Sequence, residues 1–140
     1  MITFGLSGGG GAPGSGSKRI AFAVDGGGAA LVTGVGMPVK IPYGGTLTGY
    51  TMMCSPSGSV TVNLFRAADG AGLPLASIIN NAGGGAGTGV LPAIAAGVEG
   101  KSTVFTNWGS TVLADFDNLA LNLTTVDGVV SRFSMVLYFE

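Results

Sequence analysis

Aspartates are the residues whose type and spacing come closest to those of a catalytic or metal site. Asp115 and Asp117 are two positions apart, and Asp25 and Asp127 are the other carboxylates able to cluster with them. Paired carboxylates can share a calcium ion or act as the acid and base of a glycosidase. Aspartates among small polar residues more often bond to their own backbone in turns. We favour the turn interpretation for all four.

Two glycine-rich segments match phosphate-binding patterns by their letters. Residues 95–102 read AAGVEGKS, and Gly9, Gly11 and Gly14 have the spacing of a dinucleotide fingerprint. Such loops bind phosphate only where a helix begins directly after them. Residues 103–106 instead favour a strand, and residues 9–14 lie within a glycine tract. Neither segment predicts a nucleotide site.

The composition excludes several kinds of chemistry. The 140 residues include no histidine, one cysteine, six basic and seven acidic residues, so that 9% are charged, against about 25% in ordinary soluble domains. Histidine catalysis and cysteine or histidine zinc sites are therefore excluded. A net charge of −1 predicts no nucleic-acid partner. We expect no enzymatic activity, no metal and no cofactor.

Membrane insertion and secretion are also not expected. The first residues lack the basic and apolar regions of a secretory signal. The long uncharged stretches, 41–65 and 70–98, are interrupted by glycines and by Pro42, Pro56, Asn80 and Asn81, whose polar groups lipid would leave unsatisfied. A soluble product of a cytoplasm is predicted, and the unpaired Cys54 agrees with it.

Residues 1–17 differ in composition from the rest of the chain. Ile2, Phe4 and Leu6 alternate with other residues, and the segment SGGGGAPGSGS follows at 7–17. That composition is typical of a flexible linker. We predict a flexible glycine-rich arm at 1–17, either a disordered tail or an arm whose three apolar residues dock on a neighbouring protein, and a single folded domain at 18–140.

The domain shows strand periodicity throughout. Apolar residues alternate with other residues at 20–24, 59–66, 119–124 and 129–139, and no window of 11 residues has helical spacing. A Ser-Pro-Ser-Gly turn at 55–58 pairs residues 46–54 with 59–66 as a hairpin. About eight short strands predict an all-β, jelly-roll-like antiparallel β-sandwich.

The scarcity of charge is informative about association. Interface cores are depleted in charged residues, and copies of a weakly charged protein repel one another little. We therefore expect a repeated building block covered in part by neighbours. Tyr43, Tyr50, Trp108 and Tyr138 are candidate interface aromatics, or alternatively a sugar-stacking surface.

The chain resembles small β-domains of tailed-bacteriophage virion proteins. The resemblance lies in IAFAVDGGG at 20–28, TG at 33–34, Pro42, TLT at 46–48, GSVTV at 58–62, NW at 107–108 and ADF at 114–116. It covers about residues 18–140, and its motifs are structural. In the motif Asp25-Gly26-Gly27-Gly28, the aspartate is expected to stabilise the glycine turn.

The resemblance implies a trimeric module on the virion surface. Only a short glycine arm precedes the domain here, which favours a capsid decoration (cement) or head-fibre subunit made in the host cytoplasm. Its expected partners are its own copies and the major capsid protein or another virion protein. The alternative is the receptor- or carbohydrate-binding tip of a tail fibre.

Overall fold

The computed structural model describes residues 2–7, 18–72, 76–79 and 89–140, with 2–7 described as backbone. In that part of the chain every regular element is a strand. The strands are β1 (Ile2–Ser7), β2 (Lys18–Asp25), β3 (Gly34–Val35), β4 (Val39–Lys40), β5 (Gly45–Ala67), β6 (Ala76–Ser77), β7 (Ala93–Ser102), β8 (Val112–Leu113), β9 (Asn118–Val126) and β10 (Arg132–Phe139).

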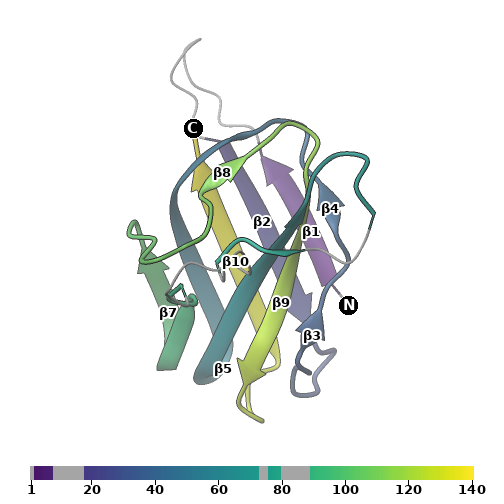
Figure 1. Ribbon diagram of the computed structural model, residues 1–140. Helices are drawn as coiled ribbons and strands as arrows, with labels where there is room; N and C mark the ends of the chain where they lie inside the picture. Colours follow the sequence, from purple (N-terminus) through teal and green to yellow (C-terminus); the bar gives the residue numbers. More distant parts are fainter. Residues whose placement is uncertain (1, 8–17, 73–75, 80–88) are drawn as a thin grey trace.

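The strands form an antiparallel β-sandwich, as the sequence predicted. The order along the sheet is β1-β2-β10-β5-β9-β3, with β4 also on β9 and β6, β7 and β8 on β5. The sheet curls over, so that β1, β2 and β10 lie in one layer and β9 with the second half of β5 in the other (Figure 1). Buried side chains of both layers form one core.

The alternation in the sequence corresponds to the alternation of buried and more exposed residues in β10, β9 and the second half of β5. In β10 the buried side chains are Phe133, Met135, Leu137 and Phe139, and in β9 they include Leu119, Leu121 and Leu123. The second half of β5 likewise buries Val60, Val62 and Leu64. Successive strand residues point to opposite faces, so alternate residues of these strands, which are apolar, enter the core.

The predicted hairpin at 55–58 is wrong. Residues 45–67 form one strand, β5, whose first half pairs with β10 and whose second half pairs with β9. The Ser55–Pro56 peptide bond is cis. The two halves belong to different layers (Figure 1), so the Ser-Pro-Ser-Gly segment bends a strand between layers instead of reversing it within one.

The loop between β9 and β10 satisfies the backbone at this bend. Ser59 N–H donates to Asp127 Oδ2 at 2.6 Å, and Ser131 N–H donates to the Ser55 carbonyl at 3.0 Å. A Cβ on Gly58 would lie 2.5 Å from Val130 Cγ2, so the close approach of loop and strand requires glycine here. These contacts are distant in sequence, which is why local turn chemistry misidentified the bend.

The prediction of a flexible arm at 1–17 differs from the structure at its beginning. Ile2–Ser7 form β1, which pairs with β2 of the same chain from Ile2↔Val24 to Ser7↔Arg19. The other edge of β2 is occupied by β10, so β1 satisfies backbone groups that would otherwise form an open edge. The side chains of Ile2, Phe4 and Leu6, and all of 8–17, lie outside the described residues, so partner binding by this segment stays a prediction.

The Asp25-Gly26-Gly27-Gly28 motif forms the turn after β2. Gly27 N–H donates to Asp25 Oδ1 at 2.8 Å, and Gly26 N–H donates to the Ser131 carbonyl at 2.8 Å. Gly27 and Gly28 have positive φ angles of 64° and 92°. A Cβ on Gly26 would lie 2.1 Å from the Ala29 carbonyl oxygen. The turn therefore requires glycine for backbone conformation at two positions and for space at the third.

Replacing Gly28 by alanine is expected to lower the free energy of unfolding by about 1 kcal/mol or more, because its φ of 92° is unfavourable for a residue with a Cβ. Gly72→Ala is the matched control, since Gly72 also has open space around it and no positive φ. Urea unfolding of both variants measures the difference. Equal midpoints would show that the turn conformation is not required.

Candidate binding surface

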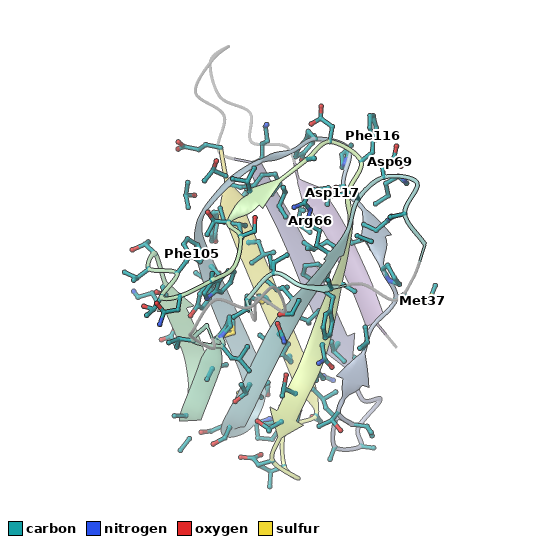
Figure 2. The ribbon with its side chains drawn as sticks, viewed as in Figure 1. Met37, Arg66, Asp69, Phe105, Phe116 and Asp117 are labelled. Atoms are coloured by element: carbon teal, nitrogen blue, oxygen red, sulfur yellow. The ribbon has the colours of Figure 1, made fainter. Side chains whose placement is uncertain are left out.

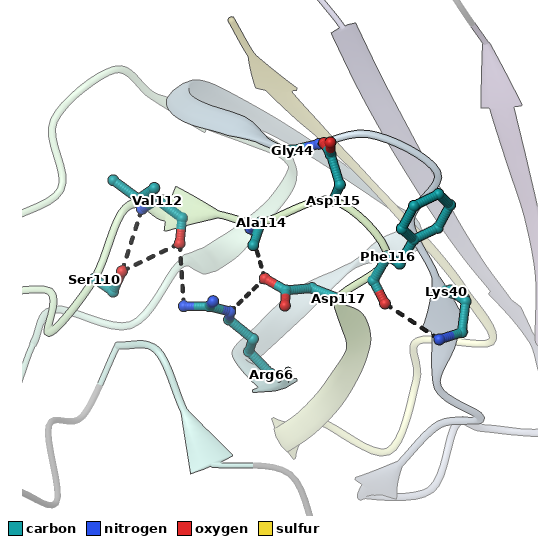
Figure 3. A network of polar contacts seen from close by, with 9 residues as sticks. All are labelled: Lys40, Gly44, Arg66, Ser110, Val112, Ala114, Asp115, Phe116 and Asp117. Atoms are coloured by element: carbon teal, nitrogen blue, oxygen red, sulfur yellow. Dashed lines mark hydrogen bonds and ion pairs between the residues drawn. The ribbon is translucent and has the colours of Figure 1, made fainter. Parts of the chain in front are cut away.

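The two aspartates closest in sequence do not form a paired-carboxylate site. Asp115 Oδ1 accepts a hydrogen bond from Gly44 N–H at 2.5 Å, whereas Asp117 Oδ2 accepts from Ala114 N–H at 2.6 Å and from Arg66 Nε at 2.5 Å. Figure 3 shows the two carboxylates directed toward these different partners. Both carboxylates accept hydrogen bonds from backbone N–H groups and stabilise the connection from β8 to β9, which agrees with the turn interpretation.

Asp25 and Asp127 also bond to backbone. Asp127 accepts from Ser59 N–H and from Val129 N–H, and Asp25 accepts from Gly27 N–H and lies 3.6 Å from Arg132 Nε. Within the described ranges, no group of three or more cysteine, aspartate or glutamate side chains is placed to hold a metal ion. The structure does not bring the four aspartates together.

The segment that resembles a phosphate loop is a strand. Ala93–Ser102 form β7, and Lys101 is the ladder partner of Thr51 in β5. Ser102 Oγ interacts with the backbone of Val104 two residues later. No helix begins in the described residues directly after β7, and the strand predicted at residues 103–106 is not formed either, because the chain there runs through a bend and a turn. Residues 95–102 therefore do not form a phosphate cradle.

Two of the four candidate aromatics belong to one cluster beside β7. The rings of Tyr50 and Trp108 are stacked with centroids 6.3 Å apart, and Phe105 meets Trp108 edge-on at 4.8 Å. Trp108 Nε1 donates to the Val90 carbonyl at 2.9 Å. These rings pack against the core. Sequence reasoning missed Phe105, because nothing in its spacing distinguishes it from a strand residue.

Burial raises the pKa of the Tyr50 hydroxyl above its ordinary value of 10.0, although the Ser102 hydrogen bond opposes this shift. The unfolded chain therefore releases this proton at lower pH than the folded chain does. Between these two pKa values the folded state binds more protons, so stability falls as pH rises. We expect the loss of thermal stability from pH 9 to 11 to be smaller in Tyr50→Phe than in the wild type. An equal loss of melting temperature in the two proteins over this pH range would contradict the prediction.

The other two candidate aromatics lie apart from that cluster. Tyr43 packs on Phe139 with ring centroids 5.9 Å apart, and Lys18 Nζ lies 5.4 Å from the Tyr43 ring centroid. Tyr138 lies on the opposite side of β10 from the buried residues, and its hydroxyl is 3.4 Å from Thr51 Oγ1. The four aromatics therefore do not form one surface.

We define the outer face as the solvent side of β2, β10, the first half of β5 and β7. Ladder partners on this face include Ala23, Ser134 and Met53 in one row and Tyr138 and Gly49 in another. It contains two cavities, of about 420 and 320 Å³. The larger is lined by Gly49, Tyr50, Thr51, Lys101, Ser102, Thr103, Val104 and Tyr138. The smaller is lined by Ala23, Val24, Asp25, Met53, Cys54, Ser55, Arg132, Phe133 and Ser134.

Large apolar side chains are also exposed elsewhere on the molecule. The most exposed are Val32 at 82% and Met37 at 77%, which with Val35 at 59% form what we call the β3 patch. A cavity of about 180 Å³ adjoins it, between β2, β3 and β9. Met37 and Phe116 project at the periphery of the molecule (Figure 2). Other exposed apolar residues are Met53, Val90, Val98, Val104, Val112, Phe116 and Val129.

No helix in the described part of the chain is long and apolar enough to cross a membrane. No protein-family model matches the chain, and no curated protein matches it.

Two solved structures show a low likeness. The N-terminal cellulose-binding domain of Cellulomonas fimi β-1,4-glucanase C is 17% identical with a TM-score of 0.41, covering 97% of this chain and 84% of that chain. A structure of infectious bursal disease virus, Gx strain, is 8% identical with a TM-score of 0.23, covering 99% of this chain and 36% of that chain. These likenesses are too low to assign a family or a ligand.

Proposed function

We propose that this chain is a bacteriophage virion structural protein, a capsid decoration (cement) or head-fibre subunit that binds the assembled capsid. The observation that supports this most is the β3 patch, with Val32 and Met37 more than three-quarters exposed. Val32 and Val35 line the same cavity, and exposed apolar residues grouped in this way are typical of interaction sites. The resemblance of residues 18–140 to phage virion domains supports the same conclusion.

Nearly half of the charged side chains of the chain are paired with one another within it. Among the described residues, Lys40 pairs with Asp69, Arg66 with Asp117 and Arg132 with Asp25. Six of the 13 ionised residues in the sequence are thus paired inside the subunit. The remaining surface suits association by shape and apolar contact, the mode expected of a shell subunit.

The proposed partners are other copies of the chain, as a homotrimer, and the major capsid protein or another virion protein. The backbone supports association at β1, which ends the strand order and has an open edge among the described strands. An open edge can pair with a strand of a neighbouring subunit. No chemical step and no cofactor is part of this function.

The function is tested on particles of the phage that encodes the chain. Gold-labelled antibody against the protein is expected to decorate the heads of wild-type particles and not those of a deletion mutant, and sedimentation of the purified protein is expected to give a trimer. Label on tails alone would contradict the capsid assignment, and absence of the protein from particles would contradict a virion role.

The β3 patch is tested by adding purified variants back to undecorated particles. Val32→Asp/Met37→Asp is expected to fold normally, since both side chains are exposed, and to lose particle binding. Val129→Asp is the matched control, because Val129 is 59% exposed in the separate loop between β9 and β10. Undiminished binding of the double variant would exclude this patch as the contact.

A further inference from the structure

The cavity beside Tyr138 is a recess in the outer face. Tyr138 and Gly49 are ladder partners on β10 and β5. A Cβ at Gly49 would lie 3.2 Å from the Ser102 carbonyl oxygen and 3.4 Å from Thr103 Cγ2, so the missing side chain keeps open the space between the tyrosine and β7. The result is a cavity of about 420 Å³ with an aromatic side chain among its walls.

The polar groups around this recess are hydroxyls and one ammonium group. Thr51 Oγ1 lies 3.4 Å from the Tyr138 hydroxyl, and Thr103 and Lys101 line the side formed by β7. Glu99 and Lys101 are alternate exposed residues of β7 and partners of Met53 and Thr51. Opposite charges therefore alternate along β7. Arg19, the exposed ladder partner of Tyr138 on β2, is a second cation on the other side of the tyrosine, so the cations near the recess are separated and do not form a continuous track.

An aromatic ring beside hydroxyls matches the two-sided chemistry of a sugar ring. The C–H face of a sugar packs on the ring, and its hydroxyls exchange hydrogen bonds with Thr51, Thr103 and the three donors of Lys101. A planar base would also stack, but a nucleic acid needs a basic track for its phosphates. The mixed charges of β7 oppose such a track and favour a neutral ligand.

The second cavity lies on the same face, further along β10. Its outward residues include Ser134, Met53 and Arg132. From Arg132 to Tyr138 the strand advances six residues, or about 20 Å at ~3.3 Å per residue. The small side chains of Ala21 and Ala23 flank this path on β2, which leaves room for a chain of linked sugars.

From these features we infer that the outer face binds a neutral oligosaccharide, with Tyr138 as the stacking residue and Thr51 and Lys101 as hydrogen-bonding partners. This inference is independent of the structural role proposed above. A shell subunit with such a site would attach the particle to polysaccharide.

The test uses the full chain on an array of neutral and acidic glycans, followed by calorimetric titration with the best neutral hit. Wild-type protein is expected to bind neutral oligosaccharides, Tyr138→Ala to lose about tenfold or more in affinity, and Tyr138→Phe to retain most of it. Phe116→Ala, which removes an aromatic that is 50% exposed away from this face, is expected to bind like the wild type.

Thr51→Val provides a second probe should Tyr138→Ala fold poorly, because valine keeps the shape and the strand preference while it removes the hydroxyl. It is expected to weaken binding severalfold. Binding to acidic glycans alone, no binding to any neutral glycan, or equal affinity of the wild type and the folded recess variants would overturn the inference. None of these outcomes bears on capsid binding through the β3 patch.

Discussion

Replacing Arg66 by methionine is expected to lower the free energy of unfolding by about 3–5 kcal/mol, because it leaves a buried carboxylate without its counter-charge. Asp117 is fully buried, and its Oδ2 accepts from Arg66 Nε and Ala114 N–H. Its other oxygen has no hydrogen-bond partner within the described residues. Arg66 also donates to the Val112 carbonyl, so its loss loosens the β8 connection as well (Figure 3).

Two further variants test whether the stability loss comes from the burial of the Arg66–Asp117 pair and not from the loss of a surface charge. Lys40→Met breaks the ion pair between Lys40 and Asp69, two side chains that are both more than half exposed. Because exposed pairs contribute little, it is expected to leave the urea midpoint close to that of the wild type. Arg66→Met/Asp117→Asn removes the buried charge but keeps an acceptor for Ala114, and is expected to recover part of the loss. Urea unfolding at pH 7 compares all three. A loss for Arg66→Met as small as that for Lys40→Met would refute the prediction.

Replacing Phe139 by alanine is expected to cost about 3–5 kcal/mol, the range for truncating a buried aromatic. Phe139 is fully buried at the end of β10, and its ring packs against that of Tyr43. Next to it, the backbones of Thr46 in β5 and Glu140 just after β10 exchange two hydrogen bonds, which hold the end of β10 against β5. Because whole domains are stable by about 5–15 kcal/mol, this variant is expected to be partly unfolded at 37 °C.

The matched controls for this variant differ in size and in location. Phe139→Leu keeps most of the apolar volume and is expected to lose less than half as much stability as Phe139→Ala. Phe116→Ala removes a ring that is half exposed and is expected to cost less than about 1 kcal/mol. Thermal melts followed by circular dichroism measure the series. Equal losses for Phe139→Ala and Phe116→Ala would mean that this end of the sandwich is not part of the core.

The class of fold could be predicted because it depends on local pattern. Leu119, Leu121 and Leu123 alternate within five residues, and a period of two is compatible with one buried face of a strand and not with a helix. The glycines of the turn after β2 were recognisable in the same way, because positive φ is nearly restricted to glycine.

The path of the strands could not be predicted because it depends on distant contacts. The segment at 55–58 has the composition of a reverse turn, yet the loop residues Asp127 and Ser131 hold it as a bend within β5. Likewise, the glycine tract after Ser7 indicates a flexible arm, and only the open edge of β2 places Ile2–Ser7 in the sheet.

For the candidate sites as well, the sequence determined which residue types are present, and only the tertiary structure determined which of them lie together. Composition alone determined that histidine chemistry is absent and that charge is scarce, since these properties need no coordinates. Only the tertiary structure separated Asp115 from Asp117, paired Arg66 with the latter, and placed Tyr138 across from Gly49. Such pairings join residues up to 89 positions apart, and the free energy of packing two layers, rather than any local preference, decides which of them meet.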